Sequence, residues 1–206
     1  MWKHENQSPE SCYFITFNTV DWIDVFIRPV YKQVVVHTLN HFIEQKGLMV
    51  YAWCLMTNHL HLLASPREGY VISEIEKEYK SFTTNKILEA IDTEPEARRN
   101  WMMDHFENFG IKLGLLKKFH VWQNCSNPVF IDLRKTPTVL EQFHHIHQNP
   151  VRDRIVDTPA EYLYSSARDY AGMQGLVNIT RLPAIEQQLV AGENVNGSFM
   201  VKYIRN

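Results

Sequence analysis

A length of 206 residues suffices for one well-filled hydrophobic core, so we expect a single domain over 1–206. With 45% hydrophobic and 21% charged residues, the composition excludes an intrinsically disordered chain. A formal net charge of -2 means that the chain is not a uniformly basic nucleic-acid binder, although basic side chains can still cluster locally on its surface.

The cysteines and the N-terminus bear on the compartment. Three cysteines without close spacing indicate neither a disulfide framework nor a cysteine-ligated zinc site. The charged N-terminal stretch lacks the apolar core of a signal peptide, and no apolar run reaches membrane-spanning length. We therefore expect a cytoplasmic protein with no membrane partner.

The first part of the chain predicts a strand, a helix and a strand hairpin. Residues 12–20 alternate and are rich in β-branched and aromatic types, which favours a strand. Apolar side chains repeat at helical spacing over 31–46, and Gly47 follows as a helix cap. The continuously apolar stretch 48–56 predicts a central strand, which a two-residue turn joins to an alternating strand over 59–64.

The second part predicts two helices and one short strand. Helical spacing runs over 72–91, whereas 92–116 has weak periodicity and is interpreted as a variable connection. A short strand is expected at 119–122. Another amphipathic helix covers 137–149, and Pro150 is expected to close it.

This order of elements predicts a ferredoxin-like βαββαβ plan, an α+β fold with a small antiparallel sheet. We expect the core of the domain at about 12–172 and a C-terminal helical extension at about 173–206.

The segment NHLHLL carries two histidines two residues apart. On a strand, the period of two places His59 and His61 on one face and Leu60 and Leu62 on the other. Two imidazoles at this spacing can chelate one divalent cation. An isolated pair of this kind is more often the polar face of an ordinary strand, but a neighbouring buried strand would hold these two rings at the fixed geometry that a metal requires.

The later helix offers a second polar pair. His145 and Asn149 lie four residues apart and therefore on one ridge, away from the apolar stripe. Asn149 can supply an amide oxygen as a third metal ligand, with His145 one turn earlier. Judged from the helix alone, an exposed polar face ending at a proline is the better explanation of the pair.

Basic and aromatic side chains are interleaved along the second half of the chain. Dispersed charge is usually solvated surface, but this mixture also suits phosphate contacts and base stacking. The candidate nucleic-acid-binding residues are Lys80, Lys118, Trp122, Arg152 and Arg154.

Several of these segments together resemble the single-tyrosine HUH transposases, particularly the branch associated with repetitive extragenic palindromes. The resemblance spans about Tyr13 to Gly172 and is carried, in chain order, by AWCLMTNHLHLLASP, EYKSFTTNKIL, VWQ, IHQNPVRDRIV and DTPAEYLYSSARDYAG. It implies a ferredoxin-like domain that cuts and rejoins single-stranded DNA at hairpin-bearing ends. A homodimer is left open.

The resemblance also implies roles for the polar residues. His59 and His61 would bind Mg²⁺ or Mn²⁺, with Asn149 completing the site. In the family, a tyrosine one helical turn before that third ligand attacks the scissile phosphate and forms a 5′-phosphotyrosine.

The chain departs from the family pattern at this nucleophile. His145 stands where the pattern Tyr-Ile-His-x-Asn-Pro has tyrosine. Four explanations are open: a degenerate copy that only binds DNA, a histidine nucleophile, a substitute tyrosine, or a chain altered at that position. The substitute tyrosines considered are Tyr162, Tyr164 and Tyr170.

Three functions follow in order of preference. The first is a metal-dependent transposase acting on hairpin-ended single-stranded DNA, with cleavage impaired at His145. The second is a non-catalytic protein that binds DNA hairpins. The third is an unrelated metal-dependent phosphodiesterase, which would need a carboxylate near the histidine pair that the strand itself does not supply.

Overall fold

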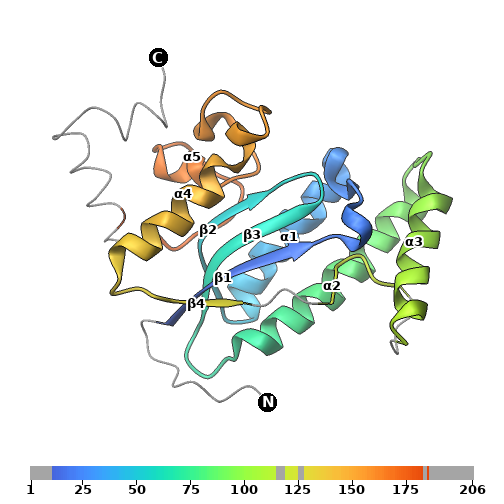
Figure 1. The fold of residues 1–206 in the computed structure, drawn as a ribbon, viewed down its shortest axis with the longest axis horizontal. Helices are drawn as coiled ribbons and strands as arrows, with labels where there is room; N and C mark the ends of the chain where they lie inside the picture. The colour runs from blue at the N-terminus through green and yellow to red at the C-terminus, as the bar shows by residue number, and fades with distance from the viewer. Residues whose placement is uncertain (1–10, 115–118, 125–127, 183–184, 186–206) are drawn as a thin grey trace.

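The computed structural model describes residues 11–114, 119–124, 128–182 and 185. Within them, four strands form one antiparallel sheet in the order β2-β3-β1-β4 (Figure 1). This is the strand order of a ferredoxin-like fold, so the predicted α+β class is confirmed. The strands are β1 (Ser11–Asn18), β2 (Leu48–Leu55), β3 (His59–Pro66) and β4 (Val129–Asp132).

Helices cover both faces of the sheet. On one face Phe17 of β1 packs against Tyr79 of α2, and on the other Phe14 packs against His145 of α4. Positions 14 and 17 point to opposite faces because strand side chains alternate. The longer helices are α1 (Pro29–Gln45), α2 (Ile72–Thr93), α3 (Arg99–Lys112) and α4 (Thr136–Arg152). Figure 1 shows α1 and α2 behind the sheet, with α4 on the other side.

The end of α1 is set by a glycine, as predicted. Gly47 has a φ of +69°, a left-handed conformation that L side chains rarely adopt. A Cβ there would lie 2.3 Å from the Tyr70 ring. The glycine therefore lets the chain turn sharply into β2 beneath that ring.

The predicted fourth strand was wrong. Trp122 forms only an isolated bridge with Thr19, and the fourth strand is β4, Val129–Asp132. Val129 and Phe130 of β4 are both exposed, so this strand lacks the alternation of a half-buried strand.

Two predictions about helices also need correction. The expected connection at 92–116 contains α3, which buries Met102, Phe106 and Gly110 at a spacing of four. Pro150 does not close α4, because the helix continues to Arg152. A proline removes a single N–H from the helix ladder, and here the last turn forms without it.

The chain after α4 runs along the outer edge of β2. It contains η3 (Pro159–Glu161) and α5 (Ala167–Tyr170). The backbone N–H of Leu55 donates to Tyr164 at 2.9 Å, and that of Ser166 donates to Trp53 at 3.0 Å. The expected extension at 173–206 lies outside the described residues from 183 onward, except for position 185.

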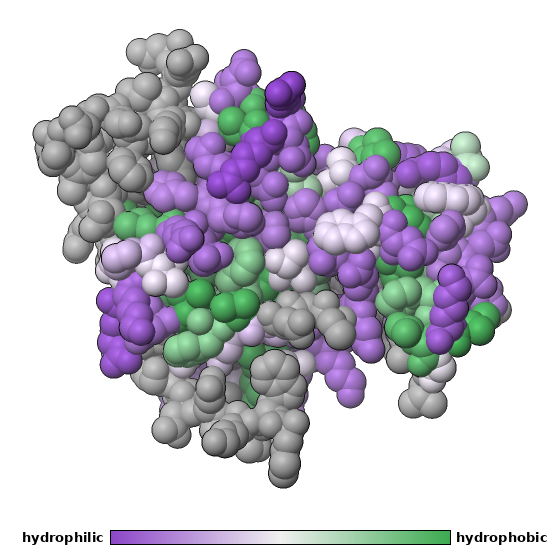
Figure 2. Space-filling model, viewed as in Figure 1, coloured by the Kyte–Doolittle hydropathy of each residue, from purple (hydrophilic) through white to green (hydrophobic). Residues whose placement is uncertain are grey.

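The surface in the view of Figure 1 is mostly hydrophilic, with apolar side chains in separate groups (Figure 2). Among the described residues, no helix combines the length and the apolar character that crossing a membrane requires.

Candidate functional site

His59 and His61 lie side by side on β3, on the face that α4 covers. Their ring centroids are 4.7 Å apart. In the β1–β3 register His61 is opposite Thr16, and His59 is opposite Asn18. The neighbouring strand therefore fixes the backbone beneath both rings.

Hydrogen bonds orient the two rings. Nδ1 of His59 lies 2.8 Å from Oδ1 of Asn58, and Nδ1 of His61 lies 2.8 Å from the Thr16 hydroxyl. Because an amide oxygen only accepts, Nδ1 of His59 carries the proton and Nε2 keeps its lone pair. The adjacent asparagine thus selects the tautomer that leaves Nε2 of His59 as a ligand atom.

Burial keeps both rings neutral. Burial, together with the smaller effects of the neighbouring His59 and His145, lowers the pKa of His61 to about 3. The pKa of His59 is also lowered, chiefly by burial. Neutral imidazoles are the form that coordinates a metal or accepts a proton.

Helix α4 contributes two more side chains to the same place. Nδ2 of Asn149 lies 3.0 Å from Nε2 of His59, and the His145 ring lies 5.2 Å from the His61 ring. The spacing of four places both on the helix ridge that faces β3. The structure therefore brings together the three predicted metal ligands and the residue at the predicted nucleophile position. We call these four residues the β3–α4 cluster: His59, His61, His145 and Asn149.

His145 is held by a neighbouring arginine. Nη1 of Arg152 lies 3.1 Å from Nδ1 of His145. A guanidinium only donates, so Nδ1 accepts and the proton of the neutral ring is on Nε2. Burial and the charge of Arg152 both lower the pKa of His145.

The donors of the β3–α4 cluster fit a divalent cation only with the help of amides. Among the described residues, no group of three His, Cys, Asp or Glu side chains is placed to share a metal ion. A cation here would use the imidazoles of His59 and His61 and the amide oxygen of Asn149, after a half-turn of that amide. Oδ1 of Asn18, across from His59, is buried with no hydrogen-bond partner in the described structure. That unsatisfied oxygen also fits a cation on this face.

The tyrosines considered as substitutes are engaged elsewhere. The hydroxyl of Tyr162 donates to the carbonyl of Leu55 at 2.8 Å, and that of Tyr170 donates to the carbonyl of Tyr51 at 3.0 Å. The Tyr164 ring is nearly buried beneath the ammonium of Lys32. Both hydroxyls donate to backbone carbonyls of β2, which disfavours either tyrosine as a substitute nucleophile.

The candidate DNA-binding residues fall into two groups. Arg152 and Arg154 are exposed at the end of α4, and Arg152 contacts His145 of the β3–α4 cluster. Lys118 lies outside the described residues.

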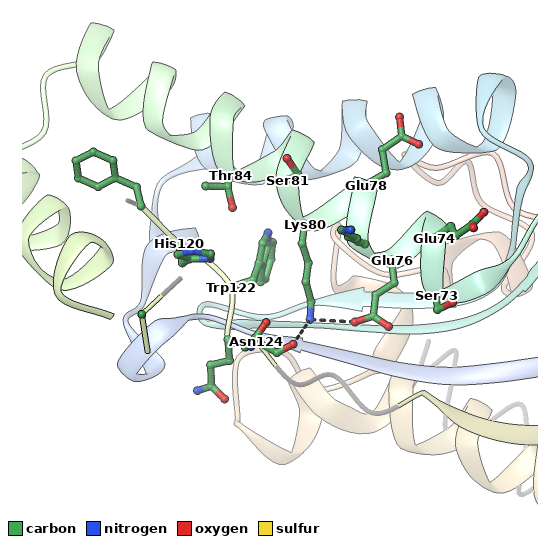
Figure 3. A pocket seen from close by; sticks show the side chains of 14 residues that line it. Ser73, Glu74, Glu76, Glu78, Lys80, Ser81, Thr84, His120, Trp122 and Asn124 are labelled. Atoms are coloured by element: carbon green, nitrogen blue, oxygen red, sulfur yellow. Dashed lines mark hydrogen bonds and ion pairs between the residues drawn. The ribbon is translucent and has the colours of Figure 1, made fainter. Parts of the chain in front are cut away.

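Lys80 and Trp122 lie on the opposite face of the sheet, by a cavity of about 920 Å³ (Figure 3). Trp122 is 2% exposed and its indole donates to Thr83, so it is a core residue and offers no open face to a base. Lys80 bonds Glu76 and the carbonyl of Asn124, which neutralises its charge. The structure therefore does not bring these two residues to the histidines. The prediction that Lys80 and Trp122 bind nucleic acid at this site is corrected.

Sequence reasoning missed the residues that support the site. Asn58 directly precedes His59, so its place in the sequence could have indicated it. Thr16 and Asn18 reach the histidines only through the β1–β3 register, which the sequence does not reveal.

Comparisons with known proteins bear on this arrangement. Residues 13–107 match the family model described as IS200-like transposase. A solved REP-associated tyrosine transposase bound to a REP hairpin superposes with a TM-score of 0.55 at 18% identity, covering 89% of this chain and 96% of that chain. A protein from Deinococcus radiodurans R1 assigned as a transposase has a TM-score of 0.42 at 16% identity, over 71% of this chain and 98% of that one. No curated protein matches.

Proposed function

We propose that this chain binds hairpin-ended single-stranded DNA and processes it with a divalent cation, its strand cleavage being weakened at His145, because residues 13–107 match the family model of IS200-like transposases. The observation that carries the proposal is the β3–α4 cluster. Residues 90 positions apart in the sequence, His59 and Asn149, meet there at 3.0 Å. The solved relative with a bound REP hairpin supports the choice of substrate.

The site's own residues would hold and orient the DNA. His59, His61 and Asn149 would hold Mg²⁺ or Mn²⁺, which when bound polarises a phosphodiester and stabilises charge on its oxygens. Asn58 and Thr16 keep the two rings in place. Arg152 and Arg154 add positive charge beside the site for phosphate contacts.

The weak step is nucleophilic attack. Nδ1 of His145 accepts from Arg152, and Nε2 carries the proton, so neither nitrogen presents an available lone pair. The phenol of a tyrosine at this position would extend further from α4 and present an oxygen. We therefore expect binding to be retained while covalent cleavage is slow or absent.

A second candidate is a protein that only binds DNA hairpins. The histidine at position 145 and the engaged hydroxyls of Tyr162 and Tyr170 favour it. The unrelated phosphodiesterase is disfavoured, because no group of three His, Cys, Asp or Glu side chains among the described residues could share a metal ion.

The decisive test compares wild type, His145→Tyr and His59→Ala/His145→Tyr on labelled hairpin-ended single strands with Mn²⁺ or Mg²⁺. We expect all three to be folded and His145→Tyr to form at least about 100-fold more covalent protein–DNA adduct than wild type, since a nucleophile is restored. The double variant should lose that gain.

Two results would change the proposal. An adduct formed by wild type as readily as by His145→Tyr would show that the chain has its own nucleophile. An inactive His145→Tyr that still binds the hairpin would leave the binding-only function.

A further inference from the structure

An exposed tryptophan lies beside the β3–α4 cluster. The connection between β1 and α1 buries Val20 completely and leaves Ile23 only 4% exposed, but Trp22 between them is 55% exposed. The Trp22 ring centroid lies 6.4 Å from that of His59, with the ring planes at 72°. The indole therefore lies beside the site and is not part of the hydrophobic core.

The backbone that presents this indole is strained. Asp21 and Trp22 have φ values of 51° and 55°, in the left-handed region that non-glycine residues avoid. Such a conformation costs on the order of 1 kcal/mol or more for each residue, and it persists only where surrounding contacts enforce it.

Those surrounding contacts are present on both sides of the loop. The Thr19 hydroxyl donates to the carbonyl of Ile23 at 2.8 Å, and the N–H of Val20 donates to Val121 at 2.8 Å. On the outer side, Oδ2 of Asp21 lies 2.9 Å from Nδ1 of His105 on α3. The loop is thus fixed at both ends while the indole stays in solvent.

Asn58 links this loop to the site. Its Oδ1 accepts from Nδ1 of His59 at 2.8 Å, and its Nδ2 lies 3.4 Å from the carbonyl of Trp22. One side chain therefore contacts both the ring of His59 and the backbone that presents Trp22.

We propose that Trp22 is a stacking platform for an unpaired base of the strand whose phosphate lies at the β3–α4 cluster. An indole that is 55% exposed gives the fold only part of its burial energy, and every base can stack on its open face whatever the sequence. Asp21 would repel a phosphate, so the contact at this loop is with the base and not with the backbone. The inference rests on the proposed function, because it needs single-stranded DNA at the site.

The test uses a hairpin with a single-stranded overhang in which 2-aminopurine replaces each overhang base in turn, with Mn²⁺ present. Wild type should quench the fluorescence most strongly at one position. Trp22→Ala should relieve that quenching and weaken overhang binding about tenfold. Trp22→Phe, which keeps an aromatic face, should stay within about threefold of wild type.

Tyr70→Ala is the matched control, since Tyr70 is similarly exposed at 42% but lies over Gly47 at the end of β3 remote from His59. We expect it to bind like wild type, and blunt hairpins to bind equally to all four proteins. If wild type binds the overhang and Trp22→Ala binds it as tightly, with quenching unchanged, the platform is refuted and the proposed function stands. Equal losses in Trp22→Ala and Tyr70→Ala would also refute it. Failure of wild type to bind any overhang would refute both.

Discussion

Asn58 directly precedes His59, and its amide oxygen decides which nitrogen of that ring carries the proton. The Oδ1 atom accepts from Nδ1 at 2.8 Å, which leaves Nε2 facing Asn149 with a lone pair. Residues that orient a ligating histidine in this way tune its affinity for a metal without touching the metal. If His59 binds a metal ion, the identity of position 58 is therefore expected to influence that binding.

We expect Asn58→Ala to lower the affinity for Mn²⁺ by about 10- to 100-fold, because the ring of His59 is then free to rotate and change tautomer. Calorimetric titration of the apoprotein with Mn²⁺ measures this directly. Asn58→Asp, which retains an oxygen acceptor, should keep most of the affinity. Wild-type affinity in Asn58→Ala would show that the hydrogen bond has no orienting role.

The buried carboxylate of Glu96 joins the start of α3 to α1. Glu96, in the turn between α2 and α3, has a side chain only 4% exposed. It accepts hydrogen bonds from the backbone N–H and guanidinium of Arg98 and from the hydroxyl of Tyr31. The Arg98 guanidinium, above all, lowers the pKa of Glu96 to about 2.

Glu96→Gln should destabilise the protein by about 2 kcal/mol at pH 7, the scale of hydrogen bonds to a charged group. The pKa in the folded protein is below the value of 4.5 in the unfolded chain, so this stabilisation is complete above about pH 5 and is lost as the pH falls toward 2. Urea unfolding of wild type and variant at pH 7 and pH 3 measures the difference, which should shrink at pH 3.

Glu89→Gln serves as the control, because its carboxylate is 63% exposed and pairs only with Lys86 at the surface. Its effect should stay below about 0.5 kcal/mol at both pH values. A Glu96→Gln difference that is the same at pH 7 and pH 3 would contradict a role for the charge.

Some elements of the fold could be predicted from the sequence and others could not. The histidines of β3 and the pair on α4 follow from local periods of two and four, so their faces were predictable from residues 59–61 and 145–149. The fourth strand was not, because Val121 and Trp122 have strand-forming types but are buried outside the sheet, where Trp122 packs against Phe17 and Phe26. Helix α3 was missed because exposed Trp101 and Ile111 obscure its narrow buried stripe.

The whole chain has a net charge of -2, so the proposed affinity for DNA must come from a local concentration of positive charge. We propose that Arg152 and Arg154, both exposed, provide it at the end of α4. Lys80, in contrast, is neutralised by Glu76 on the far face of the sheet.

Arg152→Ala and Arg154→Ala should each reduce the slope of log affinity against log salt concentration by about 1, as expected for the loss of one phosphate contact. Titrations of a fluorescent hairpin between low and moderate salt give the slopes. Lys86→Ala, on α2 and paired with Glu89, should leave the slope unchanged. Unaltered slopes in both arginine variants would place the DNA elsewhere on the surface.

The segment that follows α4 has a consequence for how copies of this chain can associate. An edge strand with unpaired N–H and C=O groups is a template for a second molecule, but β2 already pairs with Tyr164 and Ser166 of its own chain, and its Val50 carbonyl accepts from Thr180. An intramolecular partner of this kind acts at an effective concentration on the order of millimolar, which an incoming copy would have to outcompete. Two copies therefore cannot extend one sheet through β2 unless this segment first detaches. The other edge, β4, offers only 4 residues. Proteolytic loss of the segment would expose the longer edge and make the chain prone to aggregate.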